Sequence, residues 1–152
     1  MKSRPGNLNR FAEGLFACVL GCYYEDVNDP SAIRSDFSAH SHAMELPIIE
    51  VIQELVDLLG AKTVAVIGDV KETRAVQQWL AERAPQRPHV LRFALQLATM
   101  IASKADREMA VAWFHGSNPH LDDQVPMLML RNDRLENVQG PLLSAARSFA
   151  AR

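Results

Sequence analysis

The segment from His89 to Ala102 constrains the fold of this 152-residue chain most strongly, because it is apolar on nearly every side. Its spacing predicts a helix, and a helix without a polar face has to be buried. We therefore expect it either at the centre of the fold or in a subunit interface, and we predict a homodimer through residues 89–102. The apolar residues that carry this prediction are Val90, Leu91, Phe93, Leu95, Leu97, Met100 and Ile101.

Apolar residues at helical spacing predict further helices on both sides of this segment. They are expected over residues 48–59, residues 71–83, the stretch from the capping-box-like Ser103 and Asp106 to Gly116, and from about Pro141 onward, with a short apolar piece at Met127–Leu130. Gly60 and Gly116 are natural helix ends, and proline suits a first helical turn. Residues 63–67 fit either a strand or a short helix, and we favour the helix because no partner strand is evident. The fold class is therefore all-α.

The first 47 residues carry weaker signals. Residues 14–24 are apolar, but the acidic Glu25-Asp26 that follows argues against a signal peptide and favours an amphipathic helix. No apolar run reaches the length that a bilayer requires, so we expect a cytoplasmic protein with reduced thiols at Cys18 and Cys22. A zinc site that adds His40 and His42 to these cysteines is a weak alternative. Residues 25–47 contain prolines and polar residues and are expected to be a linker.

The charge is unevenly distributed along the chain. The net formal charge of −2 argues against a nucleic-acid binder. Residues 61–104, however, hold seven basic and three acidic side chains, whereas residues 1–60 hold four and nine, and residues 105–152 hold five and six. The middle of the chain is therefore a basic segment.

This basic segment coincides with the predicted helix over residues 71–83. Val76, Trp79 and Leu80 mark its core-facing side. Its opposite side carries Lys71, Thr73, Arg74, Gln77 and Gln78, with Arg83 and Arg87 beyond it. Arginine and glutamine can read base edges in a major groove, and lysine and threonine can contact phosphates. If the 71–83 helix packs across the shorter 63–67 helix, the two form a helix-turn-helix. A solvated amphipathic helix would show the same pattern of residues.

Two stretches resemble known families. Residues 64–79 (VAVIGDVKETRAVQQW) resemble the helix-turn-helix of Xre-type DNA-binding proteins. Residues 112–130 (AWFHGSNPHLDDQVPMLML), followed by Val138 and the run from Ala145 to Phe149, resemble the C-terminal toxin-binding domain of MbcA/ParS-like antitoxins. The resemblance covers about residues 48–150, and its specific part is the Trp–Gly–Asn–Pro–Leu pattern that begins at Trp113.

The resemblance implies an antitoxin that represses its own operon and blocks the active site of a RES-domain toxin. Residues 1–46 would be an N-terminal helix and linker, residues 47–104 the DNA-binding domain and residues 105–152 the toxin-binding domain. The implied toxin-binding residues are Trp113, Phe114, Asn118, Pro119 and Leu121. The first 45 residues have no counterpart in a minimal antitoxin. A stand-alone regulator without a toxin and an interaction module with a vestigial helix-turn-helix therefore remain alternatives.

Polar residues after residue 114 raise the question of catalysis. They are His115, Ser117, His120, Asp122 and Asp123. No glycine-rich phosphate loop, nucleophile elbow or metal-binding helix motif accompanies them. We therefore expect neither an enzyme nor a cofactor or metal site.

Overall fold

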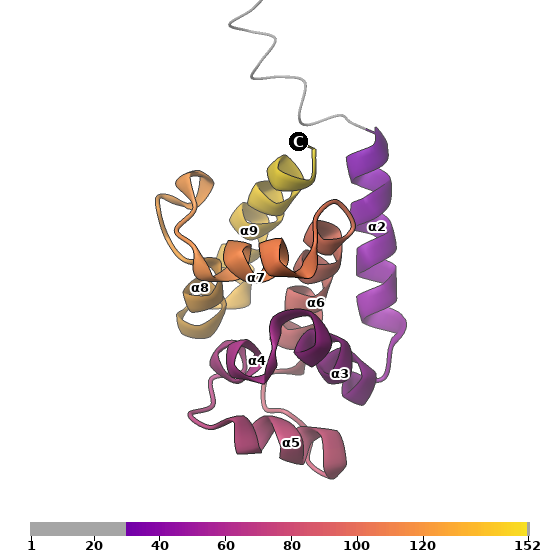
Figure 1. Cartoon of the computed structure of the whole chain (residues 1–152), viewed down its shortest axis with the longest axis vertical. Coiled ribbons are helices and arrows are strands. Elements are labelled where there is room, and N and C mark those ends of the chain that lie inside the picture. Colours follow the sequence, from indigo (N-terminus) through magenta and orange to yellow (C-terminus); the bar gives the residue numbers. More distant parts are fainter. Residues whose placement is uncertain (1–29, 152) are drawn as a thin grey trace, which may run out of the picture.

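The computed structural model describes residues 30–151, and every regular element in this range is a helix (Figure 1). The elements are α2 (Pro30–Glu45), α3 (Ile48–Leu59), α4 (Ala61–Ile67), α5 (Thr73–Ala81), α6 (Pro88–Ala102), α7 (Arg107–His115), the 3-10 helix η1 (Pro119–Leu121), α8 (Pro126–Asn132) and α9 (Leu135–Ala150). The all-α prediction is confirmed for this part of the chain. The predicted helix around residues 14–24 and the two cysteines lie outside it.

Helix α6 lies at the centre of the fold, which is the first of the two positions expected for the 89–102 segment. Pro88 begins the helix in its first turn, where a missing N–H costs nothing. Helices α2, α3 and α9 pack around α6, and ten of its fifteen residues are buried within the single chain. The predicted dimer through residues 89–102 therefore loses its basis, because the apolar surface that suggested it is already covered.

Helices α3 and α4 follow the sequence pattern closely. Gly60 ends α3 with a φ of 84°, a conformation that glycine adopts without strain. The 63–67 segment is helical, as favoured above, and Thr63, Val64 and Ile67 are buried. Helix α5 is shorter than predicted, because it begins at Thr73 rather than Lys71. Lys71 therefore lies in the turn that precedes α5.

The linker predicted for residues 25–47 is wrong over residues 30–45, which form helix α2. Small side chains face the core there, since Ala39 and Ala43 are buried against α6. Arg92 of α6 donates from Nη1 to the main-chain oxygens of Ala43 (2.6 Å) and Leu46 (2.7 Å). A cation at the C-terminal end of a helix satisfies carbonyls that lack intrahelical partners. Arg92, a member of the basic segment, thus anchors α2.

A buried polar cluster completes the attachment of α2. The Asp36 carboxylate accepts hydrogen bonds from Gln96 Nε2 (2.8 Å) and Arg147 Nε (2.9 Å), and it also contacts Arg147 Nη2. The Gln96 Oε1 atom accepts a hydrogen bond from His40 Nδ1 (3.1 Å). The cluster joins α2, α6 and α9. A buried carboxylate with a charged partner and an amide donor has its hydrogen-bonding needs met.

Two helix starts differ from the sequence-based expectations. Helix α7 is capped by Asp106, whose side chain accepts a hydrogen bond from Met109 N at 2.8 Å, whereas Ser103 donates back to the Met100 carbonyl of α6. Helix α9 begins at Leu135, six residues before Pro141. Pro141 lies inside the helix on its exposed side, so water can solvate the Asn137 carbonyl that loses its intrahelical donor.

The described helices share one hydrophobic core, with buried residues from Ala39 in α2 to Ala146 in α9. Helices of both predicted domains, 47–104 and 105–152, contribute to it, and α6 packs directly on α9. The boundary at residue 104 falls in the turn between α6 and α7. Within residues 30–151, no helix combines the length and apolar character needed to cross a membrane.

Candidate nucleic-acid interface and partner-binding region

Helix α5 lies at one end of the molecule, beside α3 and α4 and away from α9 (Figure 1). Val76 and Trp79 are buried against these helices and Leu80 is half-buried, as predicted. The predicted reading residues are all exposed: Lys71, Thr73, Arg74, Gln77 and Gln78. The structure therefore brings together the polar side chains that the sequence assigned to one face.

A close contact between Gly68 and Trp79 fixes α5 on α4. Gly68 follows α4, and a Cβ atom at this position would lie only 2.5 Å from Cη2 of the Trp79 ring. Glycine therefore allows the indole to approach the end of the shorter helix. The turn itself is ordered by hydrogen bonds from Asp69 N to Val66 O (3.1 Å) and from Val70 N to Ala65 O (2.9 Å).

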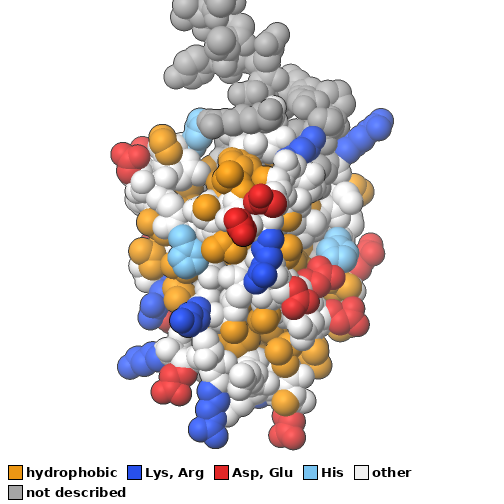
Figure 2. Space-filling view, viewed as in Figure 1, with side chains coloured by type: hydrophobic (Ala, Val, Ile, Leu, Met, Phe, Trp, Pro, Cys, Tyr) orange, Lys and Arg blue, Asp and Glu red, His pale blue; other side chains and the backbone are white. Residues whose placement is uncertain are grey.

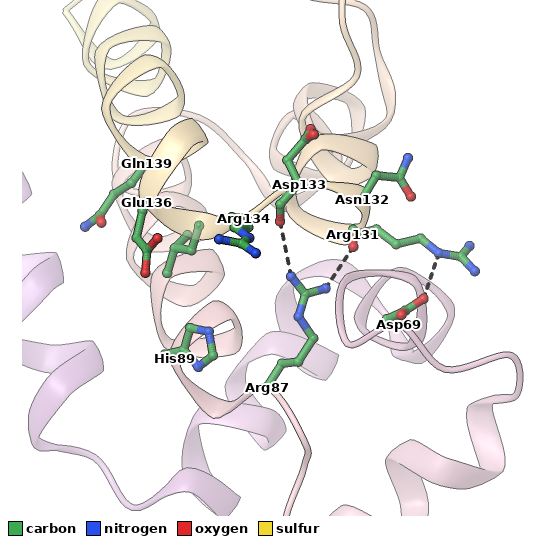
Figure 3. Close-up of a pocket in the computed structure, with 10 residues that line it drawn as sticks. Asp69, Arg87, His89, Arg131, Asn132, Asp133, Arg134, Glu136 and Gln139 are labelled. Carbon is green, nitrogen blue, oxygen red and sulfur yellow. Dashed lines mark hydrogen bonds and ion pairs between the residues drawn. The ribbon is translucent and has the colours of Figure 1, made fainter.

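The turn between α4 and α5 is also connected to the C-terminal helices. Asp69 adopts a left-handed backbone conformation with a φ of 57°. Its carboxylate accepts a hydrogen bond from Arg131 Nε of α8 at 3.1 Å. Figure 3 shows this pair at the edge of a cleft of about 540 Å³ between the start of α6 and the α8–α9 junction. No local spacing pattern indicates this contact, because the two residues lie 62 positions apart.

Arg87 was predicted to contact DNA, and in the structure it is half-buried and makes contacts within the chain. Its guanidinium donates hydrogen bonds to the carbonyls of Arg131 (2.9 Å) and Asp133 (3.4 Å), as Figure 3 shows. These carbonyls lie at the C-terminal end of α8, where a cation replaces missing intrahelical donors. Arg87 therefore supports α8. Arg83, in contrast, is exposed beyond the end of α5.

On the face shown in Figure 2, basic side chains lie toward the end of the molecule at which α5 lies, with acidic side chains among them. Exposed cations of the helix pair and its turns are Lys62, Lys71, Arg74 and Arg83, and the exposed acids are Asp69, Glu72 and Glu82. Since Asp69 is paired with Arg131, two acids that have no ion-pair partner among residues 30–151 oppose four cations on this surface. The surface is therefore basic, but only modestly so.

The predicted toxin-binding residues occupy different environments. Phe114 is fully buried, Leu121 is 4% exposed and Trp113 is 8% exposed. Phe114 and Trp113 form an edge-to-face pair with ring centroids 5.2 Å apart. Phe114 and Leu121 therefore shape this region from inside, so any part they have in binding a partner would be to support its exposed residues.

Asn118 and Pro119 form the exposed part of the same region. The Asn118 side chain accepts a hydrogen bond from His120 N at 2.9 Å and thereby caps η1, which Pro119 begins. Both residues line a depression of about 260 Å³ with Trp113, and the α9 residues Ala145 and Phe149 complete one side. Trp113 Nε1 is buried, and no group within residues 30–151 accepts a hydrogen bond from it. The depression is the part of this region that a partner can reach.

The residues considered for catalysis or metal binding occupy different structural settings. His115 Nε2 lies 2.9 Å from Thr63 Oγ1 and links α7 to α4. Asp122 and Asp123 are exposed in left-handed turns that follow η1. In residues 30–151, no group of three or more histidine, cysteine or acidic side chains could hold a metal ion. His40 and His42, the alternative zinc ligands, contact Gln96 and Glu54, and Cys18 and Cys22 lie outside the described residues.

Searches for similarity to protein-family models, to curated proteins and to solved structures gave no match to this chain.

Proposed function

We propose that this chain is a DNA-binding antitoxin-type regulator that represses its own operon and neutralises a RES-domain toxin. The exposed polar face of α5 carries the proposal. Thr73, Arg74 and Gln77 lie in its first half, where recognition helices place the side chains that read bases. The buried Val76 and Trp79 hold the helix across α4, as a helix-turn-helix requires.

The chemistry of this face suits a duplex. Arg74 can donate two hydrogen bonds to a guanine, and glutamine can pair with the edge of an adenine. Lys71 and Arg83 lie just before and just after the helix and can contact the phosphates on either side of a groove. The phosphate contacts would fix the position of the protein on DNA, and the base contacts would determine which sequence it binds.

A binding experiment tests the DNA-reading face. The wild-type chain should enrich one sequence from a pool of random duplexes, and the enriched sequence should occur upstream of its own gene. Arg74→Ala combined with Gln78→Ala should abolish the specific gel shift, because two base contacts together contribute about 2 to 6 kcal/mol. Lys104→Ala is the matched control, since this exposed cation lies in the turn at the far end of α6. A pool without an enriched sequence would contradict the proposal.

The antitoxin role is supported by the depression beside η1. It combines apolar side chains from Trp113, Pro119 and Phe149 with polar groups from Asn118 and His120. Concave surfaces of this mixed composition are typical of partner sites, in which a protruding side chain of the partner is buried. The resemblance of residues 112–130 to antitoxins specifies a RES-domain toxin as the partner.

The toxin partnership is tested by co-expression. A RES-domain protein encoded next to this chain should arrest growth alone, and the full chain should restore growth and co-purify with it. Pro119→Glu places a charge in the depression and should abolish both effects, whereas Lys104→Glu should not. Rescue by the Pro119 variant would exclude this depression as the toxin site.

A stand-alone regulator without a toxin is the second candidate function. The burial of Phe114 and Leu121 favours it, because packing alone accounts for these residues of the C-terminal pattern. Growth that is unaffected by the neighbouring gene, together with specific DNA binding, would select this second candidate.

A further inference from the structure

Helix α2 carries an apolar stripe that the rest of the described structure leaves uncovered. Phe37 is 72% exposed and Met44 is 57% exposed, the two largest values among the exposed large apolar residues of residues 30–151. They are seven residues apart and therefore lie on the same side of the helix, separated by two turns, or roughly 10 Å. Asp36, Ala39 and Ala43 face the core instead. The stripe therefore lies on a different side of α2 from the residues that attach this helix to the core.

The stripe is self-complementary when two copies of α2 run antiparallel. With a twofold axis between His40 and Ser41, Phe37 of one chain lies opposite Met44 of the other, and the reverse contact follows by symmetry. An aromatic ring beside a thioether sulfur is a favourable contact. His40 is exposed and Ser41 half-buried at the centre, so neither obstructs the approach with a bulky apolar side chain.

Charges beside the stripe favour the antiparallel orientation. Arg34 and Glu45 are both exposed and flank the stripe, Arg34 about one turn before Phe37 and Glu45 directly after Met44. In the antiparallel pair, Arg34 of one chain lies within about 3 Å of Glu45 of the other along the helix axis. A parallel pair would instead place arginine beside arginine and glutamate beside glutamate, which is unfavourable.

We infer that a second copy of this chain covers the stripe and that the protein dimerises through antiparallel α2 helices. This places the subunit interface on α2 and leaves α6 internal. A single pair of helices buries an area at the low end of specific interfaces, so the dissociation constant should lie on the order of micromolar. The inference does not depend on DNA or on a toxin, and its test contains neither.

The test is the mass of the full-length protein in solution, measured by sedimentation equilibrium through the micromolar range. The wild type should change from one chain to two as the concentration rises. Phe37→Glu should remain a single chain, and at concentrations where the wild type is also a single chain its thermal unfolding should match the wild type, because residue 37 is exposed. Met109→Glu is the matched control, since Met109 is 47% exposed on α7 and should leave dimerisation intact.

Charge reversal tests the orientation. Arg34→Glu and Glu45→Arg should each weaken the dimer, by up to about tenfold for two lost pairs at an exposed rim, and the double variant should restore it. In a parallel dimer, the single variants would keep like charges opposed and have little effect.

A wild-type protein that stays monomeric at the highest concentration would overturn the inference. If Phe37→Glu and Met109→Glu weaken the dimer equally, or if neither weakens it, the interface lies elsewhere. A monomer that Phe37→Glu destabilises would show that residues of the same chain cover the stripe.

Discussion

The exposed face of α5 and the Trp113–Leu121 region differ in where their recognisable residues lie. On α5, the residues that suggest DNA binding are exposed, and buried Val76 and Trp79 only hold the helix in place. Around η1, the apolar residues that help to make the pattern recognisable, Trp113 and Leu121, are themselves in the core. A sequence pattern built from exposed polar residues thus describes a surface. A pattern built from buried apolar residues describes a fold, and its binding surface has to be found among the neighbours.

The largest expected difference between the two regions is in stability. Phe114→Ala should lower the free energy of unfolding by about 3 to 5 kcal/mol, because it removes a fully buried ring and leaves a cavity. Urea denaturation measures this effect, and Phe114→Leu should recover a large part of it. A loss below about 1 kcal/mol would contradict the assignment of Phe114 to the core.

Gly68→Ala tests whether α5 is held as firmly as the C-terminal region. The added methyl group collides with the Trp79 ring, and such overpacking should cost about 1 to 3 kcal/mol. Gly140→Ala in α9 is the matched control, since nothing lies within 4 Å of the new Cβ, and it should stabilise the chain by about 0.5 to 1 kcal/mol. Equal effects of the two substitutions in thermal unfolding would refute the close Gly68–Trp79 contact.

Asn118→Ala should have an intermediate effect. It removes the acceptor that caps η1 and should cost about 1 kcal/mol by urea denaturation. Asn118→Asp keeps an acceptor oxygen and should retain most of the stability. Similar losses for both variants would mean that the cap contributes little and that the Asn118 side chain serves another role.

Arg74→Ala combined with Gln78→Ala should have the smallest effect on stability, within about 0.5 kcal/mol, because both side chains are exposed. A larger loss in urea denaturation would show that the α5 face is part of the fold. The distinction between the two regions would then no longer hold.

Regular apolar spacing explains which parts of the fold the sequence predicted. Helices α3 and α6 were placed nearly to the residue, since their cores are built from large apolar side chains. Helix α2 was missed because alanines and a buried carboxylate replace such side chains. The start of α9 was placed too late because proline is tolerated on its exposed side. The packing partners of Arg87 and Asp69 depend on tertiary contacts that no local spacing encodes.

The candidate binding residues, like the fold, were predictable only in part. The polar face of α5 followed from helical spacing alone, since Val76 and Trp79 fixed which side is buried. The exposure of Pro119 and the burial of Leu121 could not be separated in sequence, because both belong to one tight turn. The apolar stripe of α2 was invisible while the segment was taken as a linker.

The carbonyl contacts of Arg87 and Arg92 limit how many counterions this protein could displace from the phosphates of DNA. With these two arginines bound to helix ends, only Lys62, Lys71, Arg74 and Arg83 remain exposed on the helix pair and its turns. Four ionic contacts per chain correspond to a slope of about −3.6 in a plot of log affinity against log salt concentration. A dimer that binds DNA through the α5 face of each chain should double this slope. A salt titration would therefore show how many chains contact one duplex.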